Sequence, residues 1–403
     1  MSDGTPAARR LHPTILLMAM AHMVVDGYGN IYAPLLPLLI PRLNLTLAAA
    51  GMLTALYQLA ASVAQVGFGH LADRWRPRLL IMAGPIVSIV VLSQIGLASS
   101  TPMLAAILFV GGLGGAAFHP PAAALAHRLG GERPGLAMSV HITGGTLGFS
   151  FGPLLFGPVA ARFGLHSTPL LALPGLLVLA FFLTRVPAID VHPGHRGGLR
   201  ALKPYARPLA ILYLIVVLRT VTSLAFATFV PVMLTRRGLS VSEADATIAA
   251  YLFATGVGGF LGGPAADRYG PRRVIAWSLI VATPFMVMAP LLSGWSFVIV
   301  LAAGGMFLQS TLPVNVTFGQ MIAPVSAATV SSLMMGFAWG TGGLSVLFVG
   351  MIADRIGIRD TLLGLACVPL VAAALAVALP GGRPARVVVE RRLPAPEMPE
   401  IVD

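Results

Sequence analysis

Twelve long apolar stretches alternate with short polar segments along the chain. Six fall in the first half, at residues 14–38, 48–69, 79–98, 103–126, 135–160 and 168–186. Six more follow in the second half, at residues 208–234, 244–265, 274–293, 295–322, 326–352 and 361–380. Each is close to the roughly 20 apolar residues that a helix needs to cross a bilayer. The pattern predicts an all-α membrane protein with twelve transmembrane helices in two six-helix halves.

The two halves are related by an internal duplication. A pattern of Gly, three further residues, Asp or Ala, and Arg occurs four times, with its fifth position at Asp73, Ala161, Asp267 and Asp354. Asp267 follows Asp73 by 194 residues, and Asp354 follows Ala161 by 193. Within each half the two copies fall on opposite sides of the predicted membrane. Each half is therefore expected to be a pair of inverted three-helix repeats.

Composition agrees with a membrane location. Hydrophobic residues make up 57% of the 403 residues, charged residues make up 10%, and the mean hydropathy is +0.87. So little polar surface cannot cover a soluble globule of this length. We expect an N-terminal bundle at 1–187, a cytoplasmic linker at 188–207, a C-terminal bundle at 208–380 and a cytoplasmic tail at 381–403.

The basic residues predict the orientation. Of the 26 Lys and Arg residues, 19 fall on the same side of the predicted membrane as the two termini. Basic residues in short loops stay in the cytoplasm, so both termini are expected there. The net charge of +12 is scattered over many loops, which favours contact with anionic membrane lipid over binding of nucleic acid. Cys367 is the only cysteine, so no disulfide within the chain is possible.

Two loops resemble a known family signature. Gly69-His-Leu-Ala-Asp73-Arg74 and its echo Gly263-Pro-Ala-Ala-Asp267-Arg268 are similar to the loops that follow the second and eighth helices of the major facilitator superfamily. The resemblance implies that these residues act in gating, with the Arg side chains binding a neighbouring helix end.

A narrower resemblance covers most of the first half and part of the second. Its residues are His22-x-x-x-Asp26, Tyr57-Gln58-Leu-Ala-Ala-Ser62, Phe118-His119-Pro120, Gly144-Gly145-x-x-Gly148, Arg219 and Phe260-Leu-Gly-Gly-Pro-Ala-Ala-Asp267. They are similar to the fosmidomycin resistance family of bacterial exporters. The resemblance implies a multi-pass protein of the bacterial inner membrane that exports small toxic compounds at the expense of protons.

Asp26 is the acid that the predicted segments place in the middle of a helix, since we assign the other 13 acids to loops or tails. A charge at the bilayer centre costs roughly 2.5–3.5 kcal/mol, so it needs a partner or a hydrated cavity. His22 lies one helical turn earlier on the same face. The pair is a candidate for proton coupling; the alternative is a fixed polar contact between helices.

Arg219 is the basic residue predicted inside a helix, and it follows Asp26 by 193 residues, the length of the duplication. The superfamily resemblance implies that the helices carrying both residues line a central cavity. We therefore expect the two charges to face each other there, directly or through water. The alternatives are a static salt bridge between the halves and contact of Arg219 with an anionic substrate.

Further polar residues complete the candidate site. His119 precedes a proline that is duplicated in the second half, whereas the histidine is not, and it is a candidate for proton relay. His141 is expected to pack or to line the cavity, and the aromatic residues Phe226, Phe229 and Trp339 could shape the pocket. Polar side chains expected to line the substrate cavity with Arg219 are Tyr28, Tyr32, Gln58, Gln309 and Asn315. Each of these could instead bond a neighbouring helix.

These features predict a monomeric secondary transporter that exports small molecules by proton-coupled alternating access. An alternative on the same fold is proton-coupled or passive uptake of a small anion or nutrient. A membrane enzyme is disfavoured because the loops hold no cluster of nucleophile, base and orienting acid. No metal or cofactor is expected.

Overall fold

The computed structural model describes residues 13–72, 77–129, 134–185, 199–324 and 327–381. Described residues form helices and short connections, and none of them forms a strand. The expected linker falls mostly, and the expected tail almost wholly, outside these ranges. The all-α fold predicted from the sequence is confirmed.

Eight α-helices build the N-terminal half. They are α1 (Thr14–Gly29), α2 (Tyr32–Leu43), α3 (Leu47–Ser62), α4 (Ala64–Ala72), α5 (Pro77–Leu92), α6 (Thr101–Leu129), α7 (Pro134–Phe163) and α8 (Ala172–Leu183). Two 3-10 helices, η1 (Ser93–Leu97) and η2 (Leu165–Leu171), extend α5 and precede α8.

The C-terminal half repeats this arrangement. Its helices are η3 (Leu199–Tyr205), α9 (Ala206–Arg236), α10 (Val241–Tyr269), α11 (Pro271–Met288), η4 (Ala289–Leu291), α12 (Gly294–Gln309), α13 (Thr311–Ile322), α14 (Ala327–Ser331), the π-helix η6 (Ser332–Phe337), α15 (Ala338–Ile356), α16 (Ile358–Ala366) and α17 (Val368–Ala376).

Eleven helical segments in the described ranges are long and apolar enough to cross a membrane. The 30-residue α7 stands where the fifth helix of the predicted twelve was expected. Some predicted helices are broken in the middle. Pro34 has no N–H for the carbonyl of Asn30, and α1 ends there; Pro313 has none for the carbonyl of Gln309, where α12 ends.

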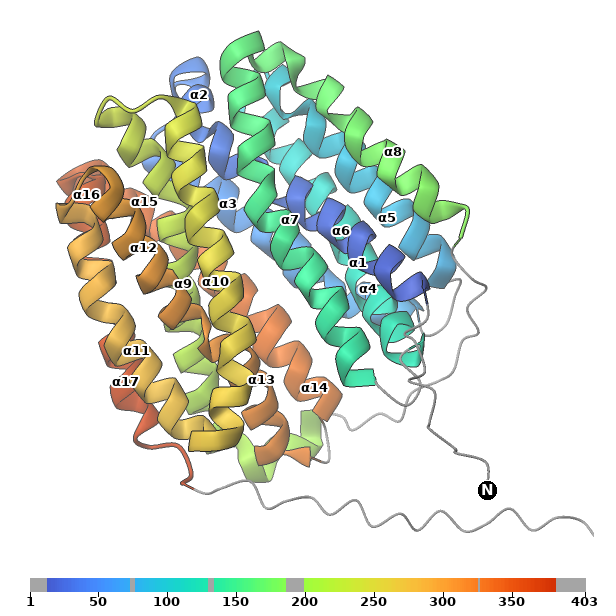
Figure 1. The fold of residues 1–403 in the computed structure, drawn as a ribbon, viewed down its shortest axis with the longest axis vertical. Coiled ribbons are helices and arrows are strands. Elements are labelled where there is room, and N and C mark those ends of the chain that lie inside the picture. The colour runs from blue at the N-terminus through green and yellow to red at the C-terminus, as the bar shows by residue number, and fades with distance from the viewer. Residues whose placement is uncertain (1–12, 73–76, 130–133, 186–198, 325–326, 382–403) are drawn as a thin grey trace, which may run out of the picture.

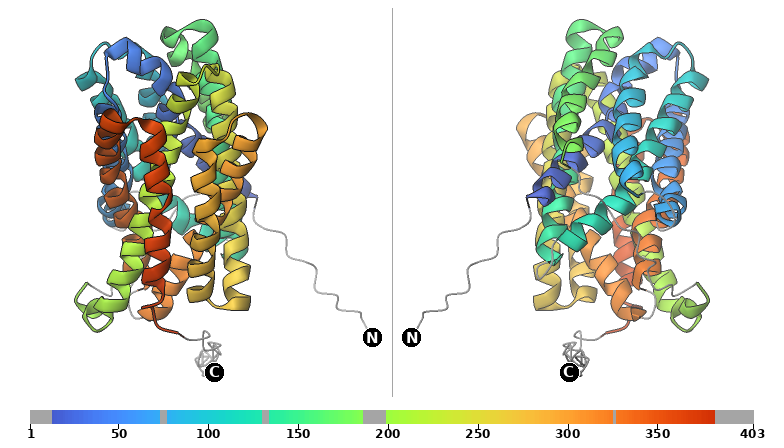
Figure 2. Two further views of the ribbon diagram at one scale, coloured as in Figure 1. Left: turned by 90° about the vertical axis from the view of Figure 1, so that its left-hand side faces the viewer. Right: turned by 90° about the vertical axis from the view of Figure 1, so that its right-hand side faces the viewer.

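The two halves lie side by side as bundles of roughly parallel and antiparallel helices (Figures 1 and 2). We call the end where α1 begins and α17 finishes the near end, and the end where α2 finishes and α3 begins the far end. Two helix pairs form most of the contact between the halves: α3 with α15, and α7 with α10.

Asp354 ties the two halves together at the far end. It lies in the last turn of α15, and its two carboxylate oxygens accept hydrogen bonds from the backbone N–H groups of Leu47 and Ala48, each at 2.8 Å. These groups belong to the first turn of α3 and have no partner within that helix. Gly350 allows this approach because a Cβ there would collide with the backbone of Leu47. The fourth copy of the repeated pattern is thus a helix cap between halves.

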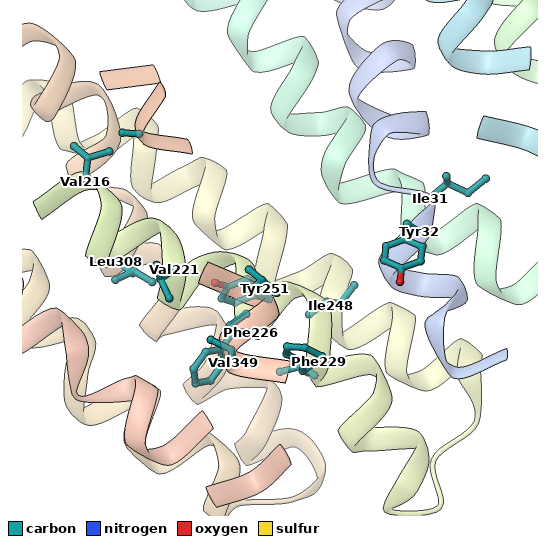
Figure 3. Close-up of a cluster of buried hydrophobic side chains, with 14 of the residues drawn as sticks. Ile31, Tyr32, Val216, Val221, Phe226, Phe229, Ile248, Tyr251, Leu308 and Val349 are labelled. Atoms are coloured by element: carbon teal, nitrogen blue, oxygen red, sulfur yellow. The ribbon is translucent and has the colours of Figure 1, made fainter. Parts of the chain in front are cut away.

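The core of the C-terminal half is packed with aromatic and branched side chains. Phe226 and Phe229 of α9 lie among Ile248 and Tyr251 of α10 (Figure 3), and both phenylalanines are fully buried. They therefore stabilise the bundle. They do not line an open pocket, which was the role that the sequence analysis had left possible.

Candidate functional site

Asp26 lies in the last turn of α1 and is contacted by two histidines. Its Oδ2 is 3.1 Å from His22 Nε2, one turn earlier in the same helix, and its Oδ1 is 3.4 Å from His119 Nε2 in α6. The carboxyl side chain is 12% exposed and the two imidazoles 12% and 24%. The structure thus brings together the three residues that the sequence proposed for proton coupling.

The hydrogen bond of His22 Nδ1 determines which ring nitrogen of His22 carries a proton. Nδ1 is 2.8 Å from the backbone carbonyl oxygen of His141 in α7. A carbonyl only accepts, so Nδ1 carries a proton and donates it. A neutral His22 would then present an Nε2 lone pair to a carboxylate that also only accepts. The contact between His22 and Asp26 is attractive only when one further proton lies on Nε2 or on the carboxyl group.

The glycine-rich stretch of α7 forms one wall of this site. Gly144 and Gly148 let α7 approach the backbone of α1 so closely that a Cβ at either position would collide with it. Gly145 faces the polar cluster: a Cβ there would lie 2.6 Å from His22 Nε2 and would also collide with Asp26. These small residues thus permit close helix packing.

His141 is closer to the site than the sequence suggested. Its ring lies 4.3 Å from that of His22, measured between centroids, and the residue is only 2% exposed. It reaches the cluster because His141 lies one turn before the glycine stretch. We infer that the His141 ring packs against His22 and that the backbone carbonyl of His141 orients the His22 ring. The sequence signal was present, since a histidine one turn from Gly144 and Gly145 falls on the same face of α7.

A cation other than a proton is not required at this cluster. Ligand-type atoms of His22, Asp26 and His119 lie within 4.8 Å of one another, a spacing that could hold a metal ion. However, the contact of His22 with Asp26 is already at hydrogen-bond distance, and a single proton satisfies it.

Arg219 does not contact Asp26 directly, so the direct form of the expected pairing is absent from this conformation. It is fully buried in α9 and hydrogen-bonds Gln309 Oε1 in α12 and, at 3.1 Å, Thr220 Oγ1. Its guanidinium carbon also lies 5.6 Å from the ring centre of Trp339 in α15. Each central charged residue thus bonds side chains of its own half, and Arg219 Nε has no hydrogen-bond partner among the described residues. Among the described residues, Arg219 forms an ion pair with no carboxylate.

Two tyrosines expected in the cavity instead bond neighbouring helices. The Tyr28 hydroxyl donates to the carbonyl of Leu171 and accepts from the N–H of Gly175 at 3.1 Å, tying α1 to α8. The Tyr32 hydroxyl donates to the carbonyl of Ala50 at 3.1 Å, tying α2 to α3. Both residues are buried, so they hold helices together, the alternative that the sequence left open.

The remaining lining candidates differ in their surroundings. Gln58 of α3 is partly exposed and packs against Gly343 of α15, at the contact between halves. Gln309 is occupied by Arg219. Asn315 of α13 is 1% exposed, and its amide oxygen and nitrogen have no hydrogen-bond partner among the described residues.

The candidate gating loops are described only in part. Asp73 and Arg74 lie outside the described residues. Gly69 is in the last turns of α4, with Pro120 of α6 nearby. Gly263, Asp267 and Arg268 lie in the last two turns of α10, where Arg268 stacks on the ring of Tyr269 at 5.2 Å. The gating role stays a prediction.

Asp245 is a buried acid that the sequence analysis counted with the loops, although it is the second residue of the predicted span 244–265. It lies in the second turn of α10 and is 0% exposed, and neither carboxyl oxygen has a hydrogen-bond partner in the described part of the chain. A local signal could have placed it correctly. Ser240 and Glu243 form a capping box, with Ser240 Oγ accepting from the Glu243 N–H at 3.2 Å, which starts α10 at Val241.

Sequence comparison decides the family. The profile of the Major Facilitator Superfamily matches residues 18–244 and 211–397 of the chain. The chain belongs to the major facilitator superfamily. It is therefore a membrane transporter and not an enzyme.

Relatives with reported names agree with this assignment. The chain is similar to the fosmidomycin resistance protein of Escherichia coli (strain K12), with 29% identity over 369 residues, 88% of this chain and 90% of that protein. It is also similar to the multidrug resistance protein MdtG of Serratia proteamaculans (strain 568), with 26% identity over 275 residues, 64% and 66% of the two chains.

A solved structure shares the fold. A bacterial homolog of the human lysosomal transporter Spinster, in an inward-facing and unoccupied conformation, superposes with a TM-score of 0.76 at 19% identity, covering 91% of this chain and 96% of that one. This likeness supports the fold of the chain over most of its length.

Proposed function

We propose that this transporter exports small toxic compounds across the bacterial inner membrane by proton-coupled alternating access. One observation carries the proton coupling: the contact of His22 with Asp26 requires a proton, because Nδ1 of His22 already donates to the carbonyl of His141. The termini would lie in the cytoplasm, which the distribution of basic residues supports.

The charge of the site changes when that proton leaves. With the proton, the pair is neutral overall, either as imidazolium and carboxylate or as imidazole and carboxylic acid. Without it, a net negative charge remains in a site that is only 12% exposed. A net charge in this position is costly unless water or another cation reaches it. Loss of the proton therefore favours a conformation in which the site is more open.

α7 links the proton site to the other half. Gly145 faces His22 and Asp26, while the next residue, Thr146, packs against α10 so closely that a Cβ at Gly256 would collide with it. A shift of α7 caused by the loss of the proton would thus act directly on α10. Movement of one half against the other is the step that alternating access requires.

Export is the direction that the relatives support. The fosmidomycin resistance protein and MdtG, which this chain resembles, are both named for drug resistance. A protein that lowers the intracellular drug concentration by transport must move the drug outward. Fosmidomycin is accordingly the first compound to test.

Uptake of a small anion is a second candidate. Arg219 is fully buried and pairs with no carboxylate among the described residues. A buried cation without a counter-charge favours a substrate with an acidic group. Proton and anion would then move together, because protonation removes the negative charge of Asp26, which would otherwise repel an anion in the same protein interior.

Everted membrane vesicles from an exporter-deficient bacterial host test both candidates. We expect accumulation of labelled fosmidomycin when the vesicle interior is acidic, loss of this accumulation in Asp26→Asn, and no change in Asp360→Asn, which alters an exposed acid of α16. Efflux of a preloaded anion driven by the same gradient would favour the second candidate. Undiminished coupling in Asp26→Asn would contradict the assignment of Asp26.

A further inference from the structure

Asp245 is a titratable group that the proposed proton site does not use. It lies on the face of α10 that packs against α7, at the far end of the contact between the two halves. Both of its oxygens are buried and lack a hydrogen-bond partner within the residues that the structure describes. A buried carboxyl group without a donor is rare in proteins, and each such group needs a physical explanation.

The carboxyl group packs directly on the backbone of the other half. A Cβ built on Gly157 of α7 would coincide with Asp245 Oδ2, so the glycine provides the space that the carboxyl occupies. With 0% exposure and the Gly157 backbone against one oxygen, the contact shields Asp245 from solvent. This shielding exists only while α7 and α10 are together.

No neighbouring charge compensates a carboxylate at this position. Charged side chains at the far end of the helices that pack against α10 are Arg42 of α2, Arg162 of α7 and Arg236 of α9, and all three are exposed. Among the described residues, none of them forms an ion pair or hydrogen bond with Asp245. The neighbouring α11, α12 and α13 carry no charged side chain at that end.

Other titratable groups nearby have partners of their own. Glu243, two residues earlier in α10, caps the helix through Ser240. The Tyr32 hydroxyl donates to Ala50, and the Tyr251 hydroxyl lies 3.5 Å from Ser223 Oγ. Asp245 is therefore isolated, and an ionised form would be a buried charge without a counter-charge.

We propose that Asp245 is a second proton-binding site, which holds its proton while the far end is closed and releases it when α7 and α10 separate. A neutral carboxylic acid fits the dry contact with Gly157, whereas an ionised one gains stability from water that reaches it on opening. Protons at the far end thus favour closure, and their loss favours opening. This gate presupposes the alternating access proposed above, but it does not depend on Asp26.

The sign of the pH dependence follows from linkage. The closed state binds one more proton at Asp245 than the open state does. Raising the pH therefore favours the open state, and the ratio of open to closed protein changes by up to about ten-fold per pH unit. Asn in place of Asp245 has the size of the protonated acid but cannot ionise.

Spin labels across the far end measure this equilibrium in the full-length protein. The background variant is Cys367→Ser, and the labels are placed at His166→Cys in η2 and Ser296→Cys in α12, both exposed at the far end on opposite halves. We expect the long-distance population to increase with pH, and Asp245→Asn to remain closed throughout. Asp360→Asn, at an exposed acid of the same end, should behave as the parent.

Repeating the titration with Asp26→Asn separates this proposal from the proposed function. The pH response should persist in that variant, because Asp245 is intact. A pH-independent distance distribution in the parent, or an unchanged response in Asp245→Asn, would overturn the second proton site. Failure of vesicle transport to respond to a pH gradient would instead overturn the proposed function and leave the gate standing.

Discussion

At the scale of single residues, the contact of His22 with Asp26 depends on the lack of a side chain at position 145. Gly145 leaves space for the imidazole and the carboxyl group to meet. We expect Gly145→Ala to separate the two groups and to lower proton-driven transport at least ten-fold, since small displacements in a catalytic or coupling site have large effects.

Gly67→Ala is the matched control for this substitution. Gly67 lies in α4, and a Cβ there would meet no atom within 4 Å. It should keep the parent transport rate in the same vesicle assay. Equal rates in Gly145→Ala and Gly67→Ala would show that the geometry of the cluster is unimportant for coupling.

Asp26 and Arg219 should act independently in this conformation. Each is bonded within its own half, so removing both should cost the sum of the two single costs within about 0.5 kcal/mol. A double-mutant cycle of Asp26→Asn and Arg219→Gln, measured by unfolding of the purified protein in detergent, checks this. A coupling energy above about 1 kcal/mol would mean that Asp26 and Arg219 interact with each other.

The duplication explains why the sequence suggested that pairing. Equal spacing correctly places Asp26 and Arg219 in corresponding helices, α1 and α9. Equal spacing in the sequence does not determine which neighbouring residue a side chain contacts. His119 and Gln309 are far from Asp26 and Arg219 in sequence, yet each contacts the charged residue of its own half.

At the scale of helices, Asp354 caps α3 from the other half. Replacement by Ala removes acceptors for two N–H groups of the first turn. We expect Asp354→Ala to lower the free energy of unfolding by about 1–2 kcal/mol, the usual cost of losing a cap. Asp354→Asn, which keeps one acceptor oxygen, should lose less, and an Ala variant as stable as the parent would exclude the cap.

The helices themselves were largely predictable, because apolar stretches and prolines are local signals. The expected span at 208–234 corresponds to α9, and that at 103–126 to α6. Breaks were missed where a proline removes a single hydrogen bond, as at the end of α1. Asp245 is the second residue of the predicted span 244–265, and it was missed because an acid so close to the boundary was counted with the loop. The capping box starts the helix before it.

At the scale of the whole molecule, the account requires the halves to move. Ser62 of α3 and Gly340 of α15 face each other across the contact between the halves. A Cβ on Gly340 would lie 3.9 Å from the Cβ of Ser62, a separation that suits a disulfide. In the Cys367→Ser background, Ser62→Cys with Gly340→Cys should form a cross-link under oxidation and stop transport.

Reduction of that cross-link should restore transport, and each single cysteine variant should be insensitive to oxidant. Transport that continues in the fully cross-linked protein would show that α3 and α15 do not separate during the cycle. The movement would then have to be confined to other contacts, such as that of α7 with α10.

The central claim is that transport exchanges the proton held between His22 and Asp26. Its most direct measurement is the proton movement that a fosmidomycin gradient drives in proteoliposomes containing a pH-sensitive dye, with no pH gradient imposed. We predict proton flux opposite to the drug in the parent protein and none in Asp26→Asn. Drug flux without proton movement in the parent, or the same proton flux in Asp26→Asn, would contradict the claim.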